Sequence, residues 1–140
     1  MEILKITAAD LDKDGFYIGQ ADATNFAGHI EIAADLGWVR FKAALRAAGY
    51  IRALAGSGIK AGEGIEAGWG IKAGSGIKAG DGIKAGGGIE AGEGTGIFAG
   101  LRVRIADWSR YAQVVARSKP NSLISGAWIE PAAESKKVEA

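Results

Sequence analysis

Arginine and aromatic side chains gather in one stretch of this chain, between Asp35 and Glu63, where no acidic residue occurs. Guanidinium groups form paired hydrogen bonds with phosphates and carboxylates, and aromatic rings stack on bases. The stretch therefore predicts a site for an anionic ligand such as a nucleotide, a phosphate or a single strand. With a second basic zone farther along, the residues assigned to this site are Trp38, Arg40, Arg46, Tyr50, Arg52, Trp69, Arg102 and Arg104. The alternative is that these charges only form a solvated outer face.

A second candidate is the segment Asp10-Leu11-Asp12-Lys13-Asp14-Gly15. Alternating carboxylates followed by glycine match the first half of a calcium-binding loop. The match ends there, because the twelfth position is Ala21 instead of a bidentate glutamate and the preceding residues predict a strand. We interpret Asp10, Asp12 and Asp14 as a polar hairpin turn, and a metal site is the less favoured alternative.

The residue types that many enzymes need are scarce. The chain has no cysteine and a single histidine, His29, which excludes a cysteine nucleophile and zinc sites with several histidines in one chain. We expect His29 to be an exposed strand residue. The sequence predicts a protein that is not an enzyme and that carries no cofactor. The remaining catalytic alternative is an active site shared across subunits.

These residues are arranged by a repeat with a six-residue period, which extends over residues 39–105. Isoleucine recurs every six residues and is followed by Lys or Glu, then Ala, then Gly, at Ile59, Ile65, Ile71, Ile77, Ile83 and Ile89. Large apolar residues fall almost wholly on odd positions, with Tyr50, Leu54 and Phe98 as exceptions, and the strand positions with even numbers carry the charges, as in a strand with one dry face. The 3.6-residue period of a helix is absent. Gly-x-Gly between the strands predicts a corner.

The predicted fold class is therefore all-β, a narrow β-solenoid with irregular caps. Two steps of the repeat are eight residues long, Ile51 to Ile59 and Ile89 to Ile97, and they are six units apart. With three strands per coil, both insertions fall on the same corner of a triangle, and the coils are 39–58, 59–76 and 77–96. Two strands per coil would also align them.

Stacking of such coils places outward residues in columns about 4.8 Å apart. The predicted columns are Arg40, Lys60, Lys78 and Phe98; Arg46, Glu66, Lys84 and Arg104; and Arg52, Lys72 and Glu90. Opposite charges then meet as the rungs Glu66/Lys84 and Lys72/Glu90.

The chain divides into four parts around this repeat. Residues 1–38 are expected to start the solenoid, with strands at 3–7 and 28–32. Residues 39–105 form the repeat, and residues 106–131 form a C-terminal cap. In this cap, residues 113–116 and 123–129 predict a hairpin, although a short helix over 107–118 is the alternative. Residues 132–140 predict a disordered tail.

The Gly-Ile-Lys/Glu-Ala-Gly-x tandem resembles a group of repeat proteins encoded by bacterial genomes and by their phages or mobile elements. More loosely, it is similar to the bactofilins, whose triangular β-solenoids polymerise end to end. Hexapeptide acyltransferases also have triangular solenoids, but their repeat places a small residue where this chain has Glu63, Trp69 or Asp81. The resemblance implies a scaffold, and the mobile-element group implies an inhibitor of host defence that sequesters a host factor.

Net charge and the absence of an apolar run limit the class of partner further. The formal net charge is +1, and the N-terminus predicts neither a signal peptide nor a membrane span. We expect a cytoplasmic protein (in the host cytoplasm if phage-encoded), without membrane partners or specific DNA binding. A homo-oligomer that binds a host protein or a small anionic ligand is the favoured hypothesis. A structural filament or trimeric fibre element is the alternative.

Overall fold

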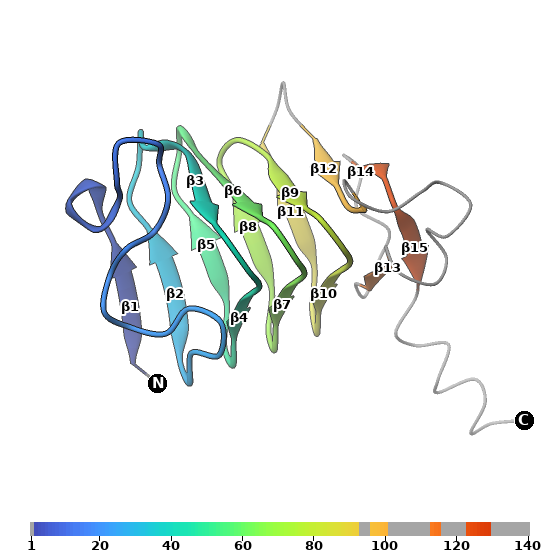
Figure 1. The fold of residues 1–140 in the computed structure, drawn as a ribbon. Coiled ribbons are helices and arrows are strands. Elements are labelled where there is room, and N and C mark those ends of the chain that lie inside the picture. The colour runs from blue at the N-terminus through green and yellow to red at the C-terminus, as the bar shows by residue number, and fades with distance from the viewer. Residues whose placement is uncertain (1, 93–95, 101–112, 116–122, 130–140) are drawn as a thin grey trace, which may run out of the picture.

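The computed structural model describes residues 2–92, 96–100, 113–115 and 123–129. Over these ranges the protein is all-β, and three parallel sheets of five strands wrap around one axis as a β-solenoid (Figure 1). The predicted fold class is confirmed, with three strands per coil. The described residues contain one short helical segment, the 3-10 helix η1 (Ala8–Asp10).

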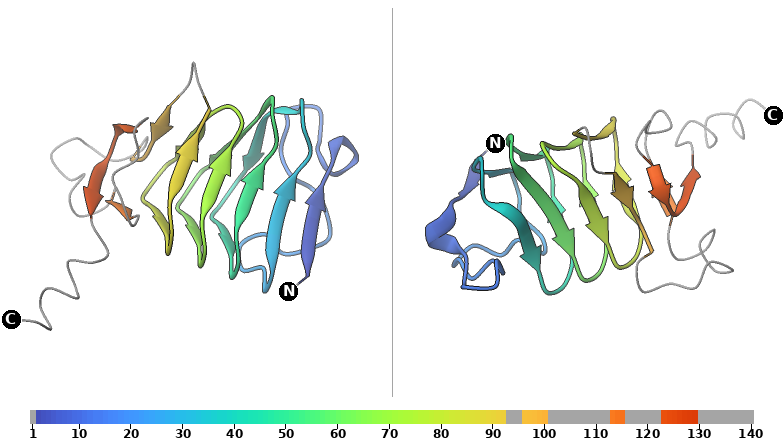
Figure 2. Two further views of the ribbon diagram at one scale, coloured as in Figure 1. Left: turned by 180° about the vertical axis from the view of Figure 1, so that it is seen from behind. Right: turned by 90° about the horizontal axis from the view of Figure 1, so that it is seen from above.

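Each sheet forms one face of the solenoid. Face 1 contains β3 (Gly37–Phe41), β6 (Ser57–Ala61), β9 (Ile77–Ala79), β12 (Ile97–Phe98) and β14 (Leu123–Ser125). Face 2 contains β4 (Leu45–Ala47), β7 (Ile65–Ala67), β10 (Ile83–Ala85), β13 (Gln113–Val115) and β15 (Ala127–Ile129). Face 3 contains β1 (Ile3–Ile6), β2 (His29–Ile32), β5 (Ile51–Ala53), β8 (Ile71–Ala73) and β11 (Ile89–Ala91). The repeat visits the three faces in turn, so equivalent strands of successive coils lie side by side (Figure 2).

The inward side of the repeat strands is apolar except at Ser57, the buried first residue of β6. Ile59, Ile77 and Ile83 have no exposed surface, and the Ala that ends each of these strands is also buried. In register, Val39 lies beside Ile59 and Ile59 beside Ile77, so isoleucines stack on one another along the axis. This confirms the predicted coil starts. Because each coil buries only a thin layer, the core exists only through stacking.

The glycines at the repeat corners are required by close approach of the backbone. A Cβ at Gly68 would collide with the carbonyl oxygen of Ala48 in the preceding coil, and one at Gly92 with that of Gly74. The second glycine has more room at some corners: a Cβ at Gly70 would lie 3.3 Å from the nearest atom, and one at Gly88 would meet no atom within 4 Å, whereas one at Gly82 would lie 2.6 Å from the carbonyl oxygen of Gln113. Neither Gly68 nor Gly88 has positive φ. At Gly68 and Gly92 the close approach of the preceding coil therefore requires glycine.

The N-terminal region adds two strands to face 3, and its connecting segment lies beside the first coil on faces 1 and 2. Strands β1 and β2 pair in parallel, and β2 pairs with β5. The long connection between β1 and β2 passes the other two faces as single bridges, Phe16 beside Arg40 and Phe26 beside Ala47. Both predicted strands are confirmed.

The predicted C-terminal hairpin is wrong. Gln113–Val115 pairs in parallel with β10 and with Ala127–Ile129, whereas Leu123–Ser125 lies on face 1 in parallel with β12. These strands therefore continue the coils. The helix alternative also fails at residues 113–115, and the predicted tail at 132–140 lies outside the described residues.

Candidate functional site

The arginines predicted to act together point to different sides of the molecule. Arg40 lies on β3 of face 1, Arg46 on β4 of face 2 and Arg52 on β5 of face 3. They belong to consecutive strands of one coil, and a triangular coil turns each strand to a different side. The single cluster expected from the sequence is not formed. Arg102 and Arg104 lie outside the described residues.

The outward rows of faces 2 and 3 contain ion pairs. Arg46 Nε lies 3.5 Å from Glu66 Oε2 on face 2, and Lys72 Nζ lies 3.8 Å from Glu90 Oε2 on face 3. The predicted rung Lys72/Glu90 is confirmed. Glu66 lies between Arg46 and Lys84 in register, but its ion pair is with Arg46. Lys84 has Val115 on its other side, where Arg104 was predicted, because the coil resumes at β13.

Face 1 has a row of three cations. Arg40, Lys60 and Lys78 are adjacent in register, which confirms the predicted column, and we call them the basic row. Phe16 lies beside Arg40 at one end, and Phe98 lies beside Lys78 at the other. Within these five described positions no carboxylate interrupts the row. Like charges directly opposite each other in a sheet are destabilising, so the sheet keeps an unfavourable arrangement here.

Aromatic rings hold the ends of the basic row. Lys78 Nζ lies 4.5 Å from the ring centre of Trp38 and 5.5 Å from that of Phe98. The Trp38 ring reaches Lys78 by lying over Gly58, where a Cβ would be 2.8 Å from it. Cation–π contacts of this kind contribute about 0.5–1 kcal/mol at exposed positions. All three cations of the row are half-buried, whereas Arg46 and Lys84 on face 2 are exposed.

The N-terminal connection adds a further ring and a further cation. The Phe16 ring lies 5.9 Å from the Arg40 guanidinium and 5.7 Å from Lys42 Nζ. The residues of this site that the sequence-based assignment missed are Phe16, Lys42, Lys60, Lys78 and Phe98. For Lys60 and Lys78 the signal was their spacing of twenty and eighteen residues from the preceding basic position of the column.

The other predicted aromatic residues lie at the corner that leads into face 3. The His29 ring stacks on Tyr50 at 4.0 Å between centroids and meets the Trp69 ring edge-on at 4.6 Å. The Arg52 guanidinium lies 4.8 Å from the centre of the Tyr50 ring. Trp69 is 55% exposed. Tyr50, Trp69 and Arg52 are thus brought together, but away from the basic row.

His29 is not the exposed residue that was predicted. It is buried, and its Nδ1 accepts a hydrogen bond of 2.9 Å from the backbone N–H of Tyr50. The ring occupies the space above Gly49, since a Cβ at Gly49 would collide with it. The burial therefore depends on a glycine twenty residues away.

The predicted hairpin turn at the aspartates is confirmed. Leu11 and Tyr17 form an antiparallel bridge, and Asp12 Oδ1 accepts hydrogen bonds of 2.9 Å from the backbone N–H groups of Asp14 and Phe16. The bond from Phe16 lowers the pKa of Asp12. The Asp10 carboxylate accepts from the N–H of Thr7. In the part of the chain that the structure describes, no three His, Cys, Asp or Glu residues form a metal-binding group.

None of the helical segments in the described ranges has the length and apolar character needed to cross a bilayer. Comparisons of this chain with protein-family models, with curated proteins and with solved structures gave no match.

Proposed function

We propose that this protein is a non-enzymatic binding protein that holds an anionic chain, of the kind presented by single-stranded nucleic acid, along face 1. The observation that carries this proposal is the basic row, Arg40, Lys60 and Lys78, where three adjacent rungs carry cations. On the other two faces the equivalent rows contain ion pairs.

The chemistry of the row fits a phosphate backbone better than a compact anion. Cations that repeat about every 4.8 Å along one line can contact successive phosphates of an extended strand. Trp38 and Phe98, which flank Lys78, add rings on which bases can stack without regard to sequence. Such binding is sequence-independent, and it suits the sequestering role that the resemblance to phage and mobile-element repeat proteins implies.

The test compares two lysines with the same local sequence. Lys78 and Lys84 both lie in Gly-Ile-Lys-Ala-Gly, but on faces 1 and 2. Binding of a fluorescently labelled oligothymidine is measured by anisotropy at several salt concentrations. We expect Lys78→Gln to weaken binding and to reduce the salt slope by about 0.7, the value for one phosphate contact on a single strand. Lys84→Gln should leave both quantities unchanged.

Two results would contradict the proposal. Equal losses in the Lys78 and Lys84 variants would mean that binding follows net charge and not the row. Failure of the wild-type protein to bind the oligonucleotide at low salt would remove the ligand class. A mononucleotide serves as competitor, and we expect it to compete weakly because it reaches only one rung. Trp38→Ala should weaken binding without changing the salt slope, since it removes a ring and not a charge.

A further inference from the structure

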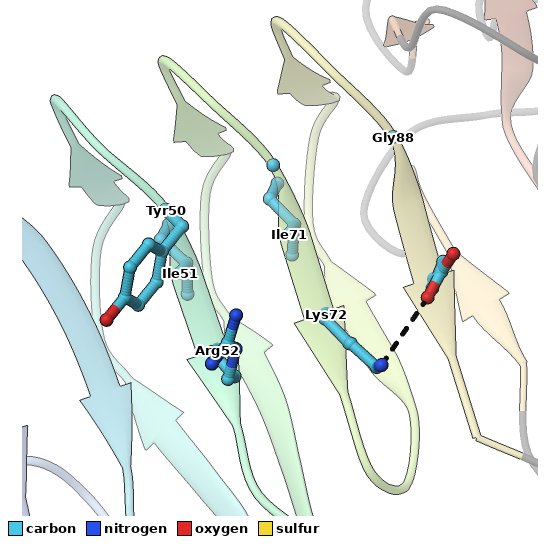
Figure 3. A pocket seen from close by; sticks show the side chains of 8 residues that line it. Tyr50, Ile51, Arg52, Ile71, Lys72 and Gly88 are labelled. Atoms are coloured by element: carbon cyan, nitrogen blue, oxygen red, sulfur yellow. Dashed lines mark ion pairs between the residues drawn. The ribbon is translucent and has the colours of Figure 1, made fainter.

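Face 3 presents two parallel outward columns that run along the solenoid axis. The first column contains Ile3, His29, Tyr50, Gly70 and Gly88. Its N-terminal half is raised by side chains, and Ile3 is 44% exposed. Its C-terminal half is bare glycine, and a shallow hollow of about 200 Å³ opens there between Tyr50 and Glu90 (Figure 3). The first column is therefore a ridge followed by a hollow.

The second column carries charge. Its members in order along the axis are Lys5, Glu31, Arg52, Lys72 and Glu90. The order of signs is positive, negative, positive, positive, negative. If this column faces a second copy of itself in the opposite direction, Lys5 lies opposite Glu90 and Glu31 lies opposite Lys72. In this column only the central Arg52 then lies opposite a residue of the same charge.

We propose that two copies of this chain pack through face 3 about a two-fold axis that runs parallel to the strands and passes over β5. This axis reverses the order of the strands along the solenoid in the second copy. Each outward column therefore faces the same column of the partner. The exposed side chain of Ile3 then lies over the hollow at the partner's Gly88. In the same arrangement Lys5 faces the partner's Glu90, and Glu31 faces the partner's Lys72.

The charges of the second column select this register. A shift by one rung in one direction places Lys5 against the partner's Lys72. A shift in the other direction places Glu31 against the partner's Glu90 and Arg52 against the partner's Lys72. Either shift therefore opposes like charges. The facing arginines at the axis are the unfavourable contact, and each guanidinium already lies 4.8 Å from the centre of its own Tyr50 ring.

The interface is small, so the dimer should be weak. Five rungs extend over about 20 Å, and the buried area falls below the range of permanent dimers. Trp69, 55% exposed beside the first column, is of the residue type enriched at the centres of interfaces. We expect association to depend on concentration in the micromolar range or above, and the proposal concerns a different face from the basic row.

The experiment is sedimentation velocity without nucleic acid, at concentrations from about 10 µM to about 0.5 mM. The wild-type mass should rise from 14.4 kDa toward twice that value. Glu31→Lys and Lys72→Glu should each remain monomeric, because each homodimer would oppose two pairs of like charges. An equimolar mixture of the two variants should dimerise again, because both cross-pairs then join Lys to Glu. Lys84→Glu, on face 2, should dimerise like the wild type.

Gly88→Trp tests the hollow separately. A Cβ at Gly88 meets no atom within 4 Å, so the variant should keep the circular dichroism spectrum of the wild type while losing the dimer. A wild-type protein that stays monomeric at the highest concentration would overturn the proposal. So would a mixture of the charge variants that fails to associate, or a ladder of masses beyond the dimer, which would indicate end-to-end stacking instead.

Discussion

Strands β9 and β10 have the same sequence, Ile-Lys-Ala, and the same buried inward side, yet their outward sides differ. Lys78 on β9 is half-buried between Lys60 and Phe98, with the Trp38 ring beside it. Lys84 on β10 is exposed between Glu66 and Val115. A lysine in this fold therefore takes its role from residues about one coil away in the chain. The inward side, by contrast, is set by the repeat itself.

The largest loss of stability is expected when a buried isoleucine is replaced, and it should be the same for β9 and β10. Ile77→Ala and Ile83→Ala should each lower the free energy of unfolding by about 2–5 kcal/mol, because each deletes a fully buried side chain from a thin core. Urea unfolding followed by circular dichroism measures this. If only one of the two variants were destabilised, the cores of the two faces would not be equivalent.

The next largest effect on stability should distinguish the two glycines Gly68 and Gly88. Gly68→Ala places a Cβ against the carbonyl oxygen of Ala48, and the strain should cost about 1–3 kcal/mol. Gly88→Ala places its Cβ in open space and should be neutral or slightly stabilising. The comparison of melting temperatures decides whether Gly68, unlike Gly88, is required by the close approach of the preceding coil. Equal melting temperatures would contradict that assignment.

The difference between faces 1 and 2 can be tested by making them alike. Glu66→Lys would give face 2 a row of three cations, because the introduced lysine would lie between Arg46 and Lys84 in register. We expect a second, weaker site for oligothymidine, since Lys84 is exposed whereas Lys78 on face 1 has the Trp38 ring beside it. A second site as strong as the first would show that charge alone suffices and that the aromatic rings are dispensable.

Single charges should have small effects on stability, of opposite sign on different faces. Lys72→Gln removes an exposed ion pair with Glu90 and should cost at most about 1 kcal/mol. Lys60→Gln relieves repulsion in the basic row and should stabilise by a few tenths, about 0.2–0.5 kcal/mol. Added salt should shrink both effects. Destabilisation by Lys60→Gln would mean that the row is not repulsive in the free protein.

The smallest effect concerns the turn that supports Phe16 at the end of the basic row. The hydrogen bond from the Phe16 N–H lowers the pKa of Asp12 below 3.8. A lowered pKa stabilises the fold above the unfolded-state value, and this contribution is lost as the pH falls through the folded-state value. The melting temperatures of the wild type and Asp12→Asn should therefore differ at pH 7 and converge as the pH falls through the lowered pKa of Asp12 in the folded state. A constant difference would contradict this role.

The aromatic rings and the stacking partners show where prediction from the sequence stopped. The columns of faces 1 and 3 follow from the repeat, and they were predicted together with the rung Lys72/Glu90. The grouping of Arg40, Arg46 and Arg52 into one site failed because consecutive strands of a triangular coil face different sides, in agreement with the three separate columns predicted for them. The hairpin at residues 113–129 failed because turn-forming residues favour antiparallel pairing locally, whereas the parallel edges of β10 and β12 offered partners already in place.

The architecture of this protein follows from its six-residue repeat. A period of six with alternating apolar and charged residues permits only short strands that bury Ile and Ala, and glycine at the corners permits coils to stack closely. The repeat also predicted the rung Lys72/Glu90, but several contacts became visible only in the folded chain. The burial of His29 over Gly49, the contact of Trp38 with Lys78 and the return of the chain at Gln113 all depend on residues far apart in sequence. Coil stacking creates these contacts, because each rung takes its neighbours from the coils on either side.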